Sequence, residues 1–130
     1  MRLKRERTKT VDIPNDPDKG SVTIKLLTLH ELDLIEEKSS DLKLGEDDSS
    51  MSLKPTKRAN AVARACIEGW DNFFNENGKP LKYSKNRIQL TSAFEVDLSD
   101  KTVRFFEWVD DEHEKFRKEV TEQEKVSVKN

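Results

Sequence analysis

Cysteine is almost absent from this sequence of 130 residues: Cys66 is the only one, so no internal disulfide can form. The two histidines, His30 and His113, are too few to complete with it a structural zinc site, which takes four Cys or His ligands at close spacing. No apolar run is long enough to span a bilayer, and no apolar stretch follows the basic residues 1–5. We therefore expect neither a membrane segment nor a secretory signal, and a reducing compartment.

Catalytic motifs are missing as well. The four glycines are isolated, so there is no phosphate-binding loop, and there is no G-x-S-x-G elbow. Cys66 lies in an apolar stripe and is expected to be buried as a small hydrophobe. Asp110 and His113 share a helix face, but without further ligands we expect His113 to pack at the edge of that face. Residues 16–20 are out of register for a calcium loop and predict a polar turn. The sequence thus predicts no enzyme and no cofactor.

Charge is plentiful but mixed in sign. Charged residues make up 38% of the chain against 33% hydrophobic ones, and the net charge is −2. An N-terminal arm, residues 1–9, has a balance of +4, whereas residues 31–48 and residues 95–114 each have a balance of −6. Acidic blocks repel phosphate, so we predict no binding to nucleic acid or membranes. A nucleic-acid-binding accessory protein that uses the arm is one alternative.

The length fits one domain. We expect a basic flexible arm at residues 1–9, a single domain at residues 10–120 and a polar tail at residues 121–130. An acidic, serine-rich loop is expected inside the domain at residues 39–54. The predicted fold class is α+β, with an N-terminal β-hairpin followed by a small helical body of three to four helices.

The N-terminal elements follow from periodicity and capping signals. Residues 8–13 and 21–26 alternate between polar and apolar, which predicts two strands, and residues 14–20 between them are rich in turn formers. Thr28 and Glu31 form a capping-box pattern that predicts a helix ending near residues 38–40. Its apolar face would carry Leu29, Leu32 and Ile35.

The middle of the chain has the clearest helical pattern. Pro55 is expected to start a helix that ends near Trp70 and Asp71. One face of that helix is predicted to be core; it carries Ala59, Val62, Ala63, Cys66, Ile67 and Trp70. Asn77 and Gly78 predict a tight turn, and we expect the neighbouring apolar side chains to point inward: Phe73, Phe74, Leu81 and Tyr83. Ser84 could cap a short helix through Leu90, although the alternation of Ile88 and Leu90 also fits a strand.

A long helix closes the sequence. We expect Asp100 to cap it and the chain to fray beyond Val120. Its main stripe carries Val103, Phe106, Val109, His113, Phe116 and Val120, and core packing of the aromatic residues is the leading interpretation. Phe105 and Trp108 are offset from that stripe, so we take them as candidate partner contacts, with a polar rim of Asp110, Asp111 and Glu112.

The order of several short segments carries a resemblance. An early strand ends in Val11-Asp12-Ile13-Pro14-Asn15-Asp16-Pro17; later come Ile67-Glu68-Gly69-Trp70-Asp71 and Asn77-Gly78-Lys79-Pro80-Leu81-Lys82-Tyr83-Ser84-Lys85-Asn86. Over roughly residues 11–108 this resembles the small tail assembly chaperones and related tail-morphogenesis proteins of long-tailed bacteriophages. The basic arm and the acidic serine-rich segment lie outside these motifs.

The resemblance implies a cytoplasmic helper in the host cell. Such a protein binds the phage tape-measure protein, keeps it soluble and promotes assembly of tail-tube proteins around it. It would need no cofactor and would catalyse no reaction. A structural virion protein of the tail or of the head–tail region is the main alternative, and the sequence leaves homo-oligomer formation open.

Overall fold

The fold is α+β, as the sequence predicts. The computed structural model describes residues 7–41 and 49–129. An antiparallel sheet of order β1-β2-β3 is formed by β1 (Thr8–Asp12), β2 (Ser21–Lys25) and β3 (Ile67–Asp71). The other elements are the helices α1 (Leu29–Asp41), α2 (Ser49–Cys66) and α3 (Phe105–Lys129), the 3-10 helix η1 (Lys85–Ala93), and the hairpin of β4 (Glu95–Asp97) and β5 (Thr102–Arg104).

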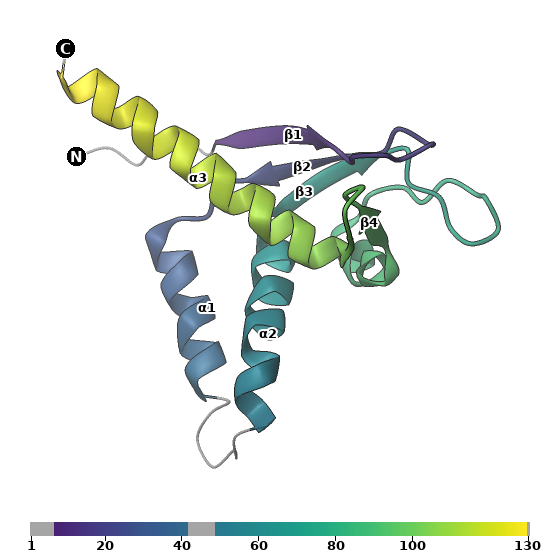
Figure 1. The fold of residues 1–130 in the computed structure, drawn as a ribbon, viewed down its shortest axis with the longest axis horizontal. Coiled ribbons are helices and arrows are strands. Elements are labelled where there is room, and N and C mark those ends of the chain that lie inside the picture. The colour runs from purple at the N-terminus through teal and green to yellow at the C-terminus, as the bar shows by residue number, and fades with distance from the viewer. Residues whose placement is uncertain (1–6, 42–48, 130) are drawn as a thin grey trace.

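The elements surround a core at the face of the three-stranded sheet. Helix α3 crosses in front of this sheet, while α1 and α2 project away from it as a pair (Figure 1). The β1–β2 loop, η1 and β4 gather at the end of the molecule away from both termini (Figure 1). None of the helices in the described ranges is long and apolar enough to cross a membrane.

The predicted N-terminal hairpin is confirmed. Strand β1 pairs with β2 from Thr8↔Lys25 to Asp12↔Ser21, and the inward-facing Val22 and Ile24 are buried. The capping box at the start of α1 is also present. The Thr28 N–H donates to Glu31 Oε1 at 3.0 Å, and the Glu31 N–H donates to Thr28 Oγ1 at 3.1 Å. The bond from the Thr28 backbone is the main reason why the pKa of Glu31 lies below its usual value.

The predicted central helix is wrong at both ends. Helix α2 begins at Ser49, so Pro55 lies inside it, and it ends at Cys66. Residues 39–41 and 49–54, expected as loop, are helical and belong to α1 and α2. In α2 the helix formers Met51, Leu53 and Lys54 offset the serines. The rest of the expected loop at 42–48, and the arm residues 1–6, lie outside the described residues.

Ile67 and Trp70 belong to strand β3, not to a helix. Ile67 pairs with Ile24 and Gly69 pairs with Thr23, which leaves Glu68 as the extra residue of a β-bulge. Because of the bulge, Ile67 and Trp70 face the same side of the sheet although they are three positions apart. The expected burial of Val62, Cys66, Ile67 and Trp70 together is confirmed. Val62 and Cys66 belong to helix α2, whereas Ile67 and Trp70 belong to strand β3.

The C-terminal helix starts later and ends later than expected. Asp100 does not cap it, because residues 95–104 form the β4–β5 hairpin and α3 begins at Phe105. The helix continues past Val120 to Lys129, so fraying at Thr121 is not observed. On α1, Leu32 and Ile35 are buried as expected, but Leu29 is 74% exposed, because it lies in the first turn, away from the core.

Candidate partner-binding site

The aromatic residues predicted to contact a partner from α3 are not exposed. Phe105 is 0% exposed and Trp108 is 4% exposed. The Phe105 ring lies 5.6 Å from that of Phe73 and 6.2 Å from that of Phe94, measured between centroids. The expectation of a free aromatic surface at these two residues is therefore wrong. Helix α3 contacts α2, η1, β4 and β5, so its offset aromatic residues are covered as well as its main stripe.

The acidic residues expected as a polar rim lie beside a different surface. Asp111 is exposed and Glu112 is half-buried. Glu112 Oε1 forms an ion pair with Lys115 Nζ at 3.3 Å. Both residues line a shallow groove of about 550 Å³ between α3 and the end of β1, whose apolar part is Pro14, Leu98 and the edge of Trp108. The groove thus brings Trp108, Asp111 and Glu112 together, but offers little aromatic surface.

Asp110 belongs to the interior edge of α3 and not to this rim. Its residue is half-buried, and its Oδ1 has no hydrogen-bond partner among the described residues. Burial raises the pKa of Asp110, and the nearby Arg58 guanidinium opposes that rise. These features describe a carboxylate at the boundary of the core.

His113 is buried more deeply than expected. It is 0% exposed, and its Nε2 accepts a hydrogen bond from the Leu27 N–H at 3.1 Å. The proton of the neutral imidazole is therefore on Nδ1, which has no partner among the described residues. Burial lowers the pKa of His113. Within residues 7–41 and 49–129 no group of three or more His, Cys, Asp or Glu is placed to hold a metal ion.

Cys66 is buried and unreactive in this fold. It is 0% exposed at the end of α2, and burial raises the pKa of its thiol to about 12. The thiolate is the nucleophilic form, so a thiol with this pKa is a poor nucleophile near neutral pH. The burial that the sequence predicts for Cys66 is confirmed.

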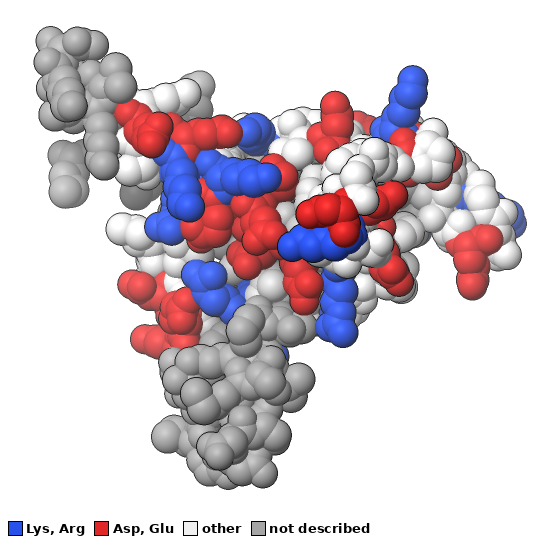
Figure 2. Space-filling model, in the orientation of Figure 1, with Lys and Arg blue, Asp and Glu red and all other residues white. Residues whose placement is uncertain are grey.

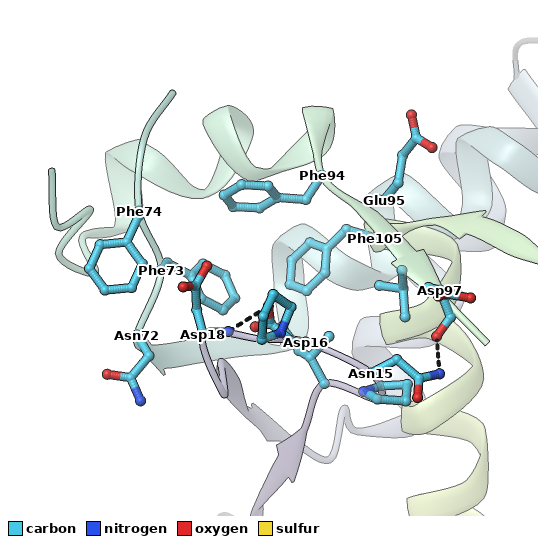
Figure 3. Close-up of a pocket in the computed structure, with 14 residues that line it drawn as sticks. Asn15, Asp16, Asp18, Asn72, Phe73, Phe74, Phe94, Glu95, Asp97 and Phe105 are labelled. Carbon is cyan, nitrogen blue, oxygen red and sulfur yellow. Dashed lines mark hydrogen bonds between the residues drawn. The ribbon is translucent and has the colours of Figure 1, made fainter. Parts of the chain in front are cut away.

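An aromatic cavity of about 250 Å³ lies between the β1–β2 loop, the segment after β3 and the start of β4. Phe73 and Phe105 are buried at its base, whereas Phe74 and Phe94 are half-buried in its wall. The rings of Phe73 and Phe94 meet edge to face at 5.3 Å between centroids. Figure 3 shows these rings gathered on one side of the β1–β2 loop.

Two asparagine side chains hold the loop that borders this cavity. Asn15 Nδ2 donates to the Asp97 carbonyl and to Ser99 Oγ, both at 2.8 Å, and so joins the loop to the β4–β5 turn (Figure 3). Asn72 Nδ2 donates to the Lys19 carbonyl at 3.2 Å, which joins the loop to the end of β3. The cavity is therefore bordered by a loop fixed on two sides.

The loop itself is the polar turn that the sequence predicts. The Asp16 carboxylate accepts the N–H groups of Asp18 at 3.2 Å and of Gly20 at 2.7 Å, so it closes the turn. A Cβ at Gly20 would lie 2.7 Å from Asp16 Oδ2 and 3.2 Å from the Phe73 ring, so a side chain there would displace the Asp16 carboxylate that closes the turn. Close approach to Asp16 and Phe73 explains the glycine.

The lining of the cavity carries charge of one sign. Among its fourteen described residues are Asp16, Asp18, Glu95 and Asp97, and none is Lys or Arg. Asp97 Oδ1 accepts the Ser99 N–H at 2.8 Å, while the Asp18 carboxylate accepts no hydrogen bond from the residues that the structure describes. The Glu95 side chain points away from the rings (Figure 3). Asp18 is thus the carboxylate best placed at the cavity, and Asp97 lies at its β4 edge.

Two of the segments that carry the resemblance in sequence, residues 67–71 and 77–86, pack against each other beside this cavity. Trp70 Nε1 donates to the Leu81 carbonyl at 2.7 Å, and the Trp70 ring meets the Tyr83 ring edge to face at 4.9 Å. Gly78 has φ of +77°, as the predicted Asn-Gly turn requires, and Phe74 pairs with Pro80 as a β-bridge. These motif residues build a structural unit that holds Phe73 and Phe74 in place.

Sequence reasoning misses the cavity because its lining residues come from four separate segments: residues 13–18, 72–74 and 94–97, and Phe105. Phe73 is buried, as expected, whereas Phe74, also expected to point inward, is only half-buried. Phe94 is not part of any periodic apolar pattern in the sequence. Because a helix is predicted to start at Asp100, the β4–β5 hairpin at residues 95–104 is not predicted. The sequence signal that could have predicted this hairpin is the pair Val96 and Val103, which face each other across the short Ser99-Asp100 turn.

Comparison with known proteins identifies no relative: no family model, no curated protein and no solved structure matches this chain.

The surface charge of the described residues is mixed in sign (Figure 2). On the face drawn in Figure 2, basic and acidic side chains of the described residues are interspersed over α3.

Proposed function

We propose that this protein is a tail assembly chaperone of a long-tailed bacteriophage. It binds the tape-measure protein in the host cytoplasm, keeps it soluble and promotes assembly of the tail tube around it. It acts by binding and catalyses no reaction.

One observation supports this proposal beyond the resemblance in sequence. Residues 13–17, which belong to the first segment that carries the resemblance, line an aromatic cavity whose wall residues Phe74 and Phe94 are only half-buried. A chaperone for a long helical protein has to offer apolar contact surface while charged neighbours keep the free protein soluble. Phe74 and Phe94 supply such surface, and the carboxylates around them supply the charge.

Co-expression with the tape-measure protein of the same phage tests the proposal. We expect wild type to increase the soluble fraction of the tape-measure protein. A Phe74→Ser variant should lose most of this effect while it keeps its circular dichroism spectrum. Leu29→Ser is the matched control, because Leu29 is 74% exposed on α1 and lies outside the cavity lining.

The opposite outcomes are equally clear. If wild type leaves the tape-measure protein insoluble and the chain is found in purified virions, a structural role in the particle replaces the chaperone role. If Leu29→Ser lowers solubility as much as Phe74→Ser does, the cavity is not the contact surface.

A further inference from the structure

The aromatic cavity combines features that together suit one kind of side chain. Its volume of about 250 Å³ is below the roughly 300–1,000 Å³ usual for small-molecule sites, and it is large enough for one long side chain. Its wall offers the half-buried rings of Phe74 and Phe94, and its charges are carboxylates without a balancing cation among the lining residues. A cationic, partly apolar occupant matches both properties.

We propose that this cavity binds an arginine side chain of the partner protein. The planar guanidinium stacks on aromatic rings and pairs with carboxylates through two parallel hydrogen bonds. Asp18 is available for such a pair, because its carboxylate accepts no hydrogen bond from the described part of the chain. The aliphatic stem of the arginine would lie along Phe74 and Phe94.

The geometry of the loop supports a site that exists before binding. The Asn15 and Asn72 side chains hold the β1–β2 loop on both sides of the cavity, and Asp16 closes the turn inside the loop. A site held in this way loses little conformational entropy when a side chain enters it. The inference rests on the proposed function only for the identity of the partner, because the arginine chemistry follows from the cavity itself.

Titration of the full chain with N-acetyl-arginine amide, followed by ¹H–¹⁵N NMR, tests the proposal. We expect saturable shifts, with a Kd on the order of millimolar for so small a ligand, confined to residues 13–18, 72–74 and 94–97. N-acetyl-citrulline amide has nearly the same shape without the charge and should give no saturable shifts. Added salt should weaken the binding of the arginine probe, because the carboxylates are accessible to solvent.

A charge-matched pair of variants sharpens the test. The double variant Asp18→Asn, Asp97→Asn should raise the Kd of the arginine probe about tenfold, because charge-assisted hydrogen bonds become neutral ones. The amide oxygen introduced by Asp97→Asn can still accept the Ser99 N–H, so the β4–β5 turn should persist. The control Asp33→Asn, Glu37→Gln removes the same charge from exposed positions on α1 and should leave the Kd unchanged.

Three results would overturn the proposal. Equal shifts with the citrulline probe, or equal weakening in the α1 control, would show that no charge-specific site exists at the cavity. Self-association of the full chain that the arginine probe reverses would assign the cavity to the basic arm of a second copy. If instead the probe binds as expected but wild type does not solubilise the tape-measure protein, the arginine site stands and the proposed function fails.

Discussion

His113 on α3 accepts a hydrogen bond from the backbone N–H of Leu27, just after β2, with 3.1 Å between Nε2 and the nitrogen. Both residues are buried, and the bond joins the long C-terminal helix to the junction between the sheet and α1. Only the neutral imidazole can accept this bond, since both ring nitrogens carry protons in the cation. The contact therefore links the stability of the fold to pH.

Acidification should weaken the fold through His113. Burial lowers the pKa of His113 below its ordinary value of 6.5, with Arg117 and Arg58 acting in the same direction and Glu114 and Glu31 opposing it. The unfolded chain therefore takes up the proton first as the pH falls. The stabilisation is complete above pH 6.5 and is lost as the pH falls from there towards the lower folded-state pKa. Urea unfolding at a series of pH values measures this loss.

Two variants separate the effect of His113 from that of the many carboxylates. His113→Gln has no titrating group at this position, so its free energy of unfolding should depend less on pH below 6.5 than that of wild type. His30→Gln removes the other histidine, which is exposed, and should leave the wild-type slope intact. Parallel curves for wild type and His113→Gln would refute the role of His113.

Cys66 should resist modification in the native state. Its thiol is 0% exposed and burial raises its pKa to about 12, so both access and thiolate content are low. We expect Ellman's reagent at about pH 8 to label the native protein slowly and the urea-unfolded protein at once. Fast labelling of native protein, at a rate similar to that of free cysteine, would contradict this packing.

The N-terminal half of the fold was predictable because its signals are local. Alternation marks β1 and β2, and the pair Thr28 and Glu31 marks the start of α1 through hydrogen bonds only three residues apart. The burial of Val62, Cys66, Ile67 and Trp70 was predictable too, since Val, Cys and Ile are among the residue types most often buried and Trp is highly buried on average.

The secondary structure of the middle was not predictable from spacing alone. The bulge at Glu68 gives a strand the three-residue spacing between Ile67 and Trp70 that a helix would have, so the periodic pattern is misleading there. The candidate site was wrong for a related reason. The offset of Phe105 and Trp108 on α3 does not reveal that Phe73 and Phe94 pack on Phe105, or that Pro14 and Leu98 lie beside Trp108.

Trp70 should be one of the most costly residues to remove. It is 7% exposed, stacks on Phe73 at 5.2 Å and donates its indole N–H to the Leu81 carbonyl at 2.7 Å. Trp70→Ala is expected to lower the free energy of unfolding by about 3–5 kcal/mol. Trp70→Phe keeps much of the apolar contact and should cost less. Denaturant unfolding measures both, and an unchanged midpoint for Trp70→Ala would mean that this face is not core.

Phe105 should act as a core residue and not as a contact residue. Its ring is 0% exposed and meets the rings of Phe73, Phe94 and Trp108. Phe105→Ala is therefore expected to cost about 3–5 kcal/mol of unfolding free energy, and a chain of this size should melt roughly 10–20 °C lower. Thermal unfolding followed by circular dichroism measures the change. Leu90→Ser, at a position that is 59% exposed on η1, is the control and should stay within about 0.5 kcal/mol of wild type.

The result decides how binding experiments on α3 can be interpreted. If Phe105→Ala melts as expected, a loss of partner solubilisation in a Phe105→Ser, Trp108→Ser variant reports unfolding, because both side chains lie in the core. Contact then has to be tested at half-buried positions such as Phe74, where the ring borders the cavity without completing the core. If Phe105→Ala instead melts with wild type and abolishes partner binding, the ring is free in solution and the α3 surface predicted from the sequence is restored.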